Sequence, residues 1–286
     1  MARRRIAEDP ISRLAVWARR LALFALVTAI LGTLIVRTGF LEIEPALATV
    51  AGALLLAVIA ILFALGALAM IWKDGLAGTG SALGAIVLGI GLIAYPGYLA
   101  SKAWHLPMIN DITTDSNDPP KLEALARVRP RRGANPVDYP GAATAELQHA
   151  AYPDVEPLLL AVSPQVAYEV VYGVIAKRKW LIVEARRPLP GRRDGHIEAV
   201  ARTPIMGFRD DVVVRLRVDG EGTRVDMRSA SRYGLHDFGT NAARIVSFLE
   251  EVDAAVDALP ETRRAEPEPP PAAPRAQEPK RSPARR

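Results

Sequence analysis

The sequence predicts two structurally different parts: an all-α transmembrane region of three helices, followed by a soluble α+β domain with a four-stranded antiparallel sheet and two flanking helices. Three observations lead to this prediction. In the 286 residues, apolar side chains are concentrated before Trp104 and charged ones after it. The first part contains three long apolar runs. The second part shows helical and strand periodicity in separate segments.

Three apolar runs, at residues 21–36, 46–72 and 75–101, predict the transmembrane helices. The last two contain no charged residue. The first is slightly short of the ~17–25 residues that a span needs, but its flanking arginines can extend to the headgroups. Backbone groups in lipid must be satisfied within the segment, so each run is expected to be helical. A cleaved signal peptide is the alternative for the first run, because it has a basic start and a short apolar core.

The arginines of the N-terminal segment predict the topology. Residues 1–20 carry six arginines, so the N-terminus is expected in the cytoplasm. Three spans then place the domain after Trp104 in the periplasm of a bacterial inner membrane, as part of a multi-pass protein. Arg37 opposes this orientation, because it falls on the outer side. The second and third runs contain no ionisable residue, which favours an anchor over a channel or pump.

Small residues line one face of the third run, at Gly80, Gly84 and Gly89. Such a face lets another helix approach closely. It either packs within the three-helix bundle or receives a membrane partner. The expected partners are therefore the lipid bilayer and, at this face, a second membrane protein.

Changes of composition divide the chain into four segments. The membrane region covers residues 1–104, a proline-rich extended strap covers 105–162, the α+β domain covers 163–259, and a disordered tail rich in proline and arginine covers 260–286. Within the domain, a helix is expected after Ser163, and a last helix from Asp237 to about Leu259. Four strands are expected between these helices, at residues 180–184, 196–203, 211–218 and 223–231.

The last two strands predict a hairpin around residues 219–222. If Val218 lies opposite Thr223, Arg215 lies opposite Asp226 on one face, and Leu216 packs beside Val225 on the other. The alternation of charged and apolar side chains therefore sets the register.

Ten polar residues, which we call the polar cluster, gather at the predicted strand ends and at the start of the last helix. They are Arg202, Asp210, Asp211, Arg228, Ser229, Ser231, Arg232, Asp237, Asn241 and Arg244. One interpretation is an anionic ligand held by the last three of the four cluster arginines, because guanidinium groups and helix starts bind anions. The other is a structural network in which the aspartates neutralise the arginines.

Catalytic, metal and cofactor sites have little support in the sequence. A hydrolase would use Ser229 or Ser231 with His236 and Asp237, but adjacent side chains do not easily act as base and orienting acid. Cysteine is absent and the histidines have no zinc spacing. Pro119 and Pro120, directly after the acidic stretch at residues 111–118, occupy positions where a calcium loop must turn. The net charge of +5 lies mostly at the two ends, so a nucleic-acid partner is not expected.

The polar cluster resembles an uncharacterised bacterial and plastid family, the domain of unknown function 1499, and the chain is similar to its membrane-anchored alphaproteobacterial type. The resemblance covers residues 108–259, and the segment from Arg228 to Arg244 is its most specific part. Many members begin with a cysteine-containing segment, whereas residues 111–115 here contain none. The resemblance implies a domain and no reaction.

Three functions follow as expectations. The first is a membrane-anchored domain that binds an anionic or lipidic ligand of the cell envelope, at the polar cluster or between sheet and helices. The second is a structural or assembly protein without a ligand. A hydrolase is the third, so enzymatic activity is not the leading expectation.

Overall fold

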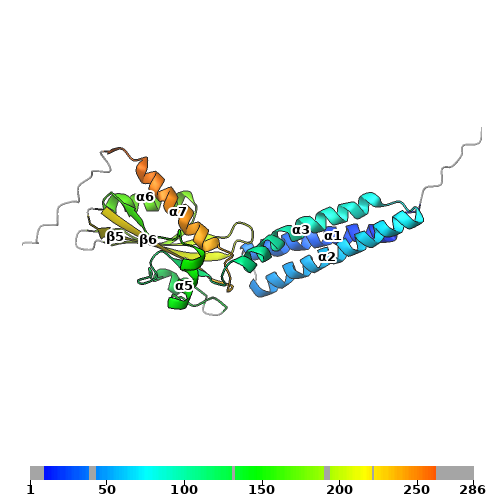
Figure 1. Cartoon of the computed structure of the whole chain (residues 1–286), viewed down its shortest axis with the longest axis horizontal. Coiled ribbons are helices and arrows are strands. Elements are labelled where there is room, and N and C mark those ends of the chain that lie inside the picture. The colour runs from blue at the N-terminus through cyan, green and yellow to red at the C-terminus, as the bar shows by residue number, and fades with distance from the viewer. Residues whose placement is uncertain (1–9, 39–42, 131–132, 190–193, 221, 262–286) are drawn as a thin grey trace, which may run out of the picture.

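The computed structural model describes residues 10–38, 43–130, 133–189, 194–220 and 222–261. Its two parts lie end to end, with a helical bundle on one side and a sheet-containing domain on the other (Figure 1). Most of the predicted disordered tail, and the arginines of the first nine residues, lie outside the described residues.

The bundle consists of α1 (Arg13–Thr38), α2 (Ile43–Asp74) and α3 (Thr79–His105). By length and composition, all three are able to cross a membrane, which confirms the predicted apolar helices. Small side chains fill the bundle interior, where alanines such as Ala18, Ala64 and Ala85 are fully buried. Large apolar side chains, such as Phe24 and Leu62, face outward. This arrangement suits a lipid environment, in which close packing rather than burial from water holds helices together.

Among the residues that the structure describes, the domain contains one antiparallel sheet of six strands. They are β1 (Asp111–Thr113), β2 (Leu158–Leu160), β3 (Leu181–Arg186), β4 (Gly195–Arg202), β5 (Arg209–Asp219) and β6 (Gly222–Ser231). The order is β1-β6-β5-β4-β3, and β2 also pairs with β6.

The prediction of four strands was therefore wrong. The two additional strands have three residues each and lie in the strap. They form where the strap meets the free edge of β6, at Ile112 opposite Ser229 and at Leu159 opposite Arg224. Three residues are too few to show the alternation of a strand. Pairing with β6, rather than the local sequence, makes these segments extended.

The hairpin of β5 and β6 has the predicted register. Val218 lies opposite Thr223, Arg215 opposite Asp226, and Leu216 opposite Val225. The alternation of side chains therefore determined which residues face each side of the sheet.

Helices α6 (Pro164–Lys177) and α7 (Thr240–Asp257) cover one face of the sheet (Figure 1). The core between them is filled by fully buried side chains, among them Val171, Leu216, Met227 and Phe248. These side chains fill the space between sheet and helices in which a ligand was one of the expectations.

The start of α7 differs from the prediction. The helix begins at Thr240, after Gly239, whose φ of 76° is left-handed. Asp237 lies outside the helix, yet its carboxylate accepts hydrogen bonds from the backbone N–H groups of Gly239 and Asn241 at 2.9 Å each. The expected capping carboxylate is thus present, but one turn earlier than the helix itself.

The other face of the sheet is covered by the strap. This segment forms α4 (Ala124–Val128) and α5 (Ala142–Ala151) in addition to β1 and β2. Leu122 and Leu125 pack there against Val200, Val213 and Ala230 of the sheet. Both faces of the sheet are therefore buried, which places polar side chains of either face inside the domain.

Candidate functional site

The polar cluster lies at the end of the sheet near the bundle, and its members are divided between the two faces. Successive strand residues point to opposite faces, so Asp210 faces the helices and Asp211 faces the strap. For the same reason, Ser229 lies on the helix side and Arg228 on the strap side. Arg202 is exposed and donates a hydrogen bond to the backbone oxygen of Arg37 at 3.0 Å. The cluster is thus two separate networks with one outlying arginine.

On the helix side, Arg244 is the centre of the network. Its guanidinium donates to Ser229 Oγ at 2.8 Å, to Asn241 Oδ1 and to the carboxylate of Asp210. Asn241, which is fully buried, donates through Nδ2 to Ser231 Oγ at 2.9 Å. Burial raises the pKa of Asp210, and the positive charge of Arg244 opposes this effect. The arginine is therefore neutralised by a carboxylate within its own network.

On the strap side, Arg228 and Asp111 form a bidentate ion pair with distances of 2.9 and 2.7 Å. Arg228 also donates to the backbone oxygens of Pro120 and Val137, and both members of the pair are only 3% exposed. Paired, parallel N–H···O bonds fix geometry as well as charge. The contact joins the strap to β6 across 117 sequence positions.

The other strap-side arginine, Arg232, shares a carboxylate with Arg129. Arg232 donates to Asp211 Oδ1 at 2.8 Å, and Arg129 to Asp211 Oδ2 at 2.8 Å. Arg129 also donates to the backbone oxygens of Asn135 and Pro136. Sequence reasoning missed Asp111 and Arg129, because both lie in the strap, far along the chain from their partners.

A third, more exposed network lies outside the polar cluster and farther from the bundle. Three arginines meet three aspartates there: Arg215, Arg217 and Arg224 with Asp115, Asp118 and Asp226. The acidic stretch of the strap therefore contacts arginines of the hairpin, and these explain its charge without a bound cation.

Glu184, His196 and Glu198 are close enough to hold a metal ion, with one potential ligand atom of each within 4.8 Å of the others. However, both oxygens of the fully buried Glu198 already accept hydrogen bonds. The donors are the backbone N–H groups of Glu123, Ala124 and Leu125, at 2.7–3.0 Å, and His196 Nε2 at 2.9 Å. Burial alone would raise the pKa of Glu198, but these bonds lower it to about 2. The carboxylate is thus explained as an anchor for the start of α4.

The serines considered for hydrolysis do not meet a histidine. Ser229 and Ser231 bind Asn241, whereas His236 Nδ1 accepts a hydrogen bond from the backbone of Phe238. Ser116 Oγ lies 3.1 Å from His149 Nε2 in an exposed position. Within the described residues, no carboxylate is hydrogen bonded to His149. The pair therefore lacks the acid that orients the histidine in a catalytic triad.

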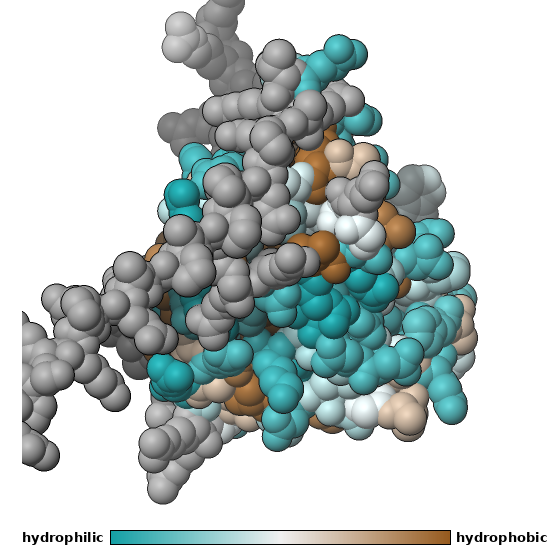
Figure 2. All heavy atoms as spheres, turned by 90° about the vertical axis from the view of Figure 1, so that its left-hand side faces the viewer, coloured by the Kyte–Doolittle hydropathy of each residue, from teal (hydrophilic) through white to brown (hydrophobic). Residues whose placement is uncertain are grey.

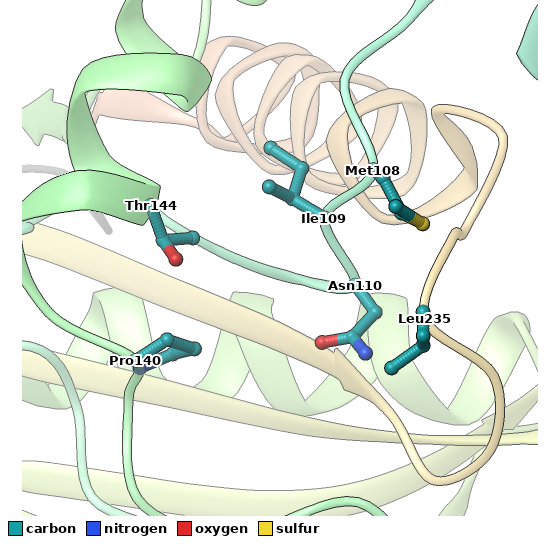
Figure 3. A pocket seen from close by; sticks show the side chains of 6 residues that line it. All are labelled: Met108, Ile109, Asn110, Pro140, Thr144 and Leu235. Carbon is teal, nitrogen blue, oxygen red and sulfur yellow. The ribbon is translucent and has the colours of Figure 1, made fainter.

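A small open hollow lies beside the start of β1. Met108, Ile109, Asn110, Pro140, Thr144 and Leu235 line a volume of about 200 Å³ (Figure 3). The only amide in this lining is already engaged, since Asn110 Nδ2 donates to the backbone oxygen of Gly234 at 2.7 Å. The hollow is apolar on most sides, and no arginine of the polar cluster lines it.

Comparison with known proteins assigns the soluble part. The model of a family described as protein of unknown function (DUF1499) matches residues 111–252. The chain belongs to this family. The matched segment begins with Asp111 of β1 and includes all ten residues of the polar cluster, so the DUF1499 domain contains both buried networks. No curated protein is significantly similar to the chain.

Proposed function

We propose that this DUF1499 protein is a structural or assembly component of the bacterial inner membrane. In this proposal it is a multi-pass protein with its N-terminus in the cytoplasm and its domain in the periplasm. The observation that carries the proposal is the pairing of the cluster arginines. Arg228, Arg232 and Arg244 each contact a buried aspartate.

An anion receptor needs a cation whose charge is not already neutralised. Here an incoming anion would have to displace a buried carboxylate, which would then lose its partner in a medium of low polarity. The three arginines also lie on two faces of the sheet and cannot converge on one ligand. These features support a rigid scaffold, in which the ion pairs fix how the strap and α7 sit on the sheet.

The outer face of α3 supports a role in assembly. A Cβ atom added at Gly89 would lie 2.7 Å from a side-chain carbon of Ile61, so this glycine serves packing within the bundle. A Cβ atom added at Gly80 or Gly84 would meet nothing within 4 Å. We propose that these two glycines receive a helix of a membrane partner, because small residues allow close approach between helices in lipid.

Single-cysteine variants test this assembly role, since the natural chain contains no cysteine. In native membranes, a thiol-attached photocrosslinker at Gly80→Cys or Gly84→Cys is expected on irradiation to link the chain to a partner of defined mass. The control, Gly89→Cys, should stay unlinked because its side chain faces α2. If the two outer positions also stay unlinked, the proposed partner face is wrong.

Reporter fusions test the topology separately. A reporter that is active only in the periplasm, fused at Gly133 in the strap, is expected to be active. An inactive periplasmic reporter together with an active cytoplasmic one at the same position would reverse the proposed orientation.

Binding of a lipidic ligand is the second candidate, and the hollow beside β1 supports it. Met108 and Leu235 on its rim are 66% and 68% exposed, so apolar surface is available to a ligand. A discrete lipid that co-purifies with the full chain and is lost in Leu235→Glu would favour this candidate. The same lipid content in wild type and variant would dismiss it.

A further inference from the structure

The loop between β4 and β5 has an unusual composition for the surface of a soluble domain. Its sequence from Thr203 to Phe208 is Thr-Pro-Ile-Met-Gly-Phe, and arginines flank it at positions 202 and 209. Ile205 is 44% exposed. By contrast, the described surface at the opposite end of the domain is largely hydrophilic (Figure 2). An apolar tip between two cations is the pattern of a segment that enters a membrane interface.

The loop also lies directly against α1. Arg37, at the end of that helix, donates from Nη1 to the backbone oxygens of Pro204 at 2.6 Å and Ile205 at 3.0 Å. Gly207 is so close to the helix that an added Cβ atom would lie 2.8 Å from Cγ of Arg37. Its φ of 70° is left-handed. The loop is therefore held against α1 by contacts that only glycine permits.

The contact between Met206 and Thr33 indicates how deep the loop lies. Thr33 Oγ1 is 3.8 Å from Met206 Sδ. Thr33 precedes Arg37 by four residues, which at ~1.5 Å per residue is ~6 Å along the helix. It belongs to the apolar run that predicts the first span. The tip of the loop thus reaches the level of the last apolar turn of α1.

Most backbone groups of the loop are already satisfied, as a lipid environment requires. Thr203 N donates to the oxygen of Phe208, and Gly207 N donates to the oxygen of Thr203. Phe208 N donates to Thr203 Oγ1 at 2.9 Å. Pro204 has no N–H group to satisfy. The backbone oxygens of Pro204 and Ile205 accept hydrogen bonds from Arg37. The loop therefore keeps these backbone hydrogen bonds when it leaves water.

We propose that residues 203–208 form a membrane-inserted loop that binds phospholipid of the bilayer in which the helices are anchored. Ile205 and Met206 contact the part of the acyl chains that is nearest to the headgroups. Arg202 and Arg209 lie at the level of the phosphates. Arg37 then has a defined role on this side of the membrane, because it fixes the loop to the first helix. The domain is thereby attached to the bilayer at a second point, besides its connection through α3.

Depth measurements by electron paramagnetic resonance test this proposal on the full chain. A spin label would be attached to Ile205→Cys in nanodiscs of phosphatidylethanolamine and phosphatidylglycerol. The control is Leu159→Cys, whose native side chain is 65% exposed in β2. Leu159 pairs with Arg224, eight residues along the hairpin from the level of Arg209, which is ~26 Å at ~3.3 Å per residue.

The label's collision rate with oxygen is divided by its collision rate with a water-soluble nickel complex. This ratio is expected to be several-fold higher at Ile205→Cys than at the control. Equal accessibility to nickel at both positions would overturn the proposal. Protection from both reagents at Ile205→Cys would also overturn it, because it would indicate burial against protein. In Arg37→Ala, the label at Ile205→Cys is expected to become more accessible to nickel. An unchanged depth of the label in that variant would refute the role of Arg37. It would have no bearing on the proposed partner face at Gly80 and Gly84 of α3.

Discussion

Replacement of Arg228 by alanine tests the structural interpretation of the polar cluster. Arg228 and Asp111 are both 3% exposed, and the pair has two short hydrogen bonds. Removal of one member of a buried pair costs ~3–5 kcal/mol, because the remaining charge stays buried without compensation. The oxygens of Pro120 and Val137 would lose a donor as well. Since whole domains are stable by only ~5–15 kcal/mol, the loss should be large.

Urea unfolding of the full chain in nanodiscs measures this loss. Trp180 is the one tryptophan after residue 104, and it stacks on Phe248 of α7 at 5.3 Å, so its fluorescence reports the domain core. The control is Arg217→Ala, because Arg217 is 30% exposed at the side chain and two other arginines still contact Asp226. Its expected cost is ~0–1 kcal/mol.

A double variant separates the pair from its surroundings. Arg228→Met combined with Asp111→Leu removes both charges and is expected to recover most of the stability lost in Arg228→Ala. Unfolding of Arg228→Ala at the wild-type urea concentration would refute the reasoning, because the pair would then contribute nothing to the fold.

Four further substitutions have defined outcomes. The lowering of the Glu198 pKa from 4.5 to about 2 corresponds to ~3 kcal/mol of stability that is present above pH 4.5 and lost as the pH falls toward 2. Glu198→Gln should therefore be less stable at pH 7 and show a flatter acid-unfolding profile; an unchanged profile would contradict this. Gly222→Ala should lower the urea midpoint, because its Cβ atom would lie 2.4 Å from the backbone oxygen of Leu160. Gly173→Ala, inside α6 with open space around it, should instead stabilise by up to ~1 kcal/mol; equal effects of the two alanines would contradict the packing described. Phe248→Ala should cost ~3–5 kcal/mol and shift the Trp180 emission to the red, because Phe248 is fully buried; near-wild-type stability would show that α7 is loosely packed.

The elements predicted correctly are those determined by local pattern. Long apolar runs gave the three helices, and alternation in residues 211–231 gave the hairpin with its register, including Arg215 opposite Asp226. The two short strands were missed because three residues contain no period. They are extended only because β6 offers a free edge, which is a property of the tertiary structure.

The polar cluster was predicted as a group but not in its arrangement. Its members are near one another along the chain, yet Asp210 and Asp211 point to opposite faces of one strand. The partners that decide its chemistry, Asp111 and Arg129, are 117 and 82 positions from the residues they bind. Arg37 is a similar case, because its sequence position alone indicates only a charge on the unfavourable side of a span. Its partners, the backbone oxygens of Pro204 and Ile205, are 167 and 168 positions away.

Native mass spectrometry of the full chain, released from membranes in detergent, tests the central claim that the polar cluster is structural. The comparison is wild type with Arg244→Lys, which keeps the charge and changes the hydrogen-bond geometry. Both proteins are expected to have the mass of the bare chain once loosely held lipid is removed. A discrete adduct on the wild type that disappears in Arg244→Lys, while the domain stays folded, would contradict it and identify the cluster as a ligand site.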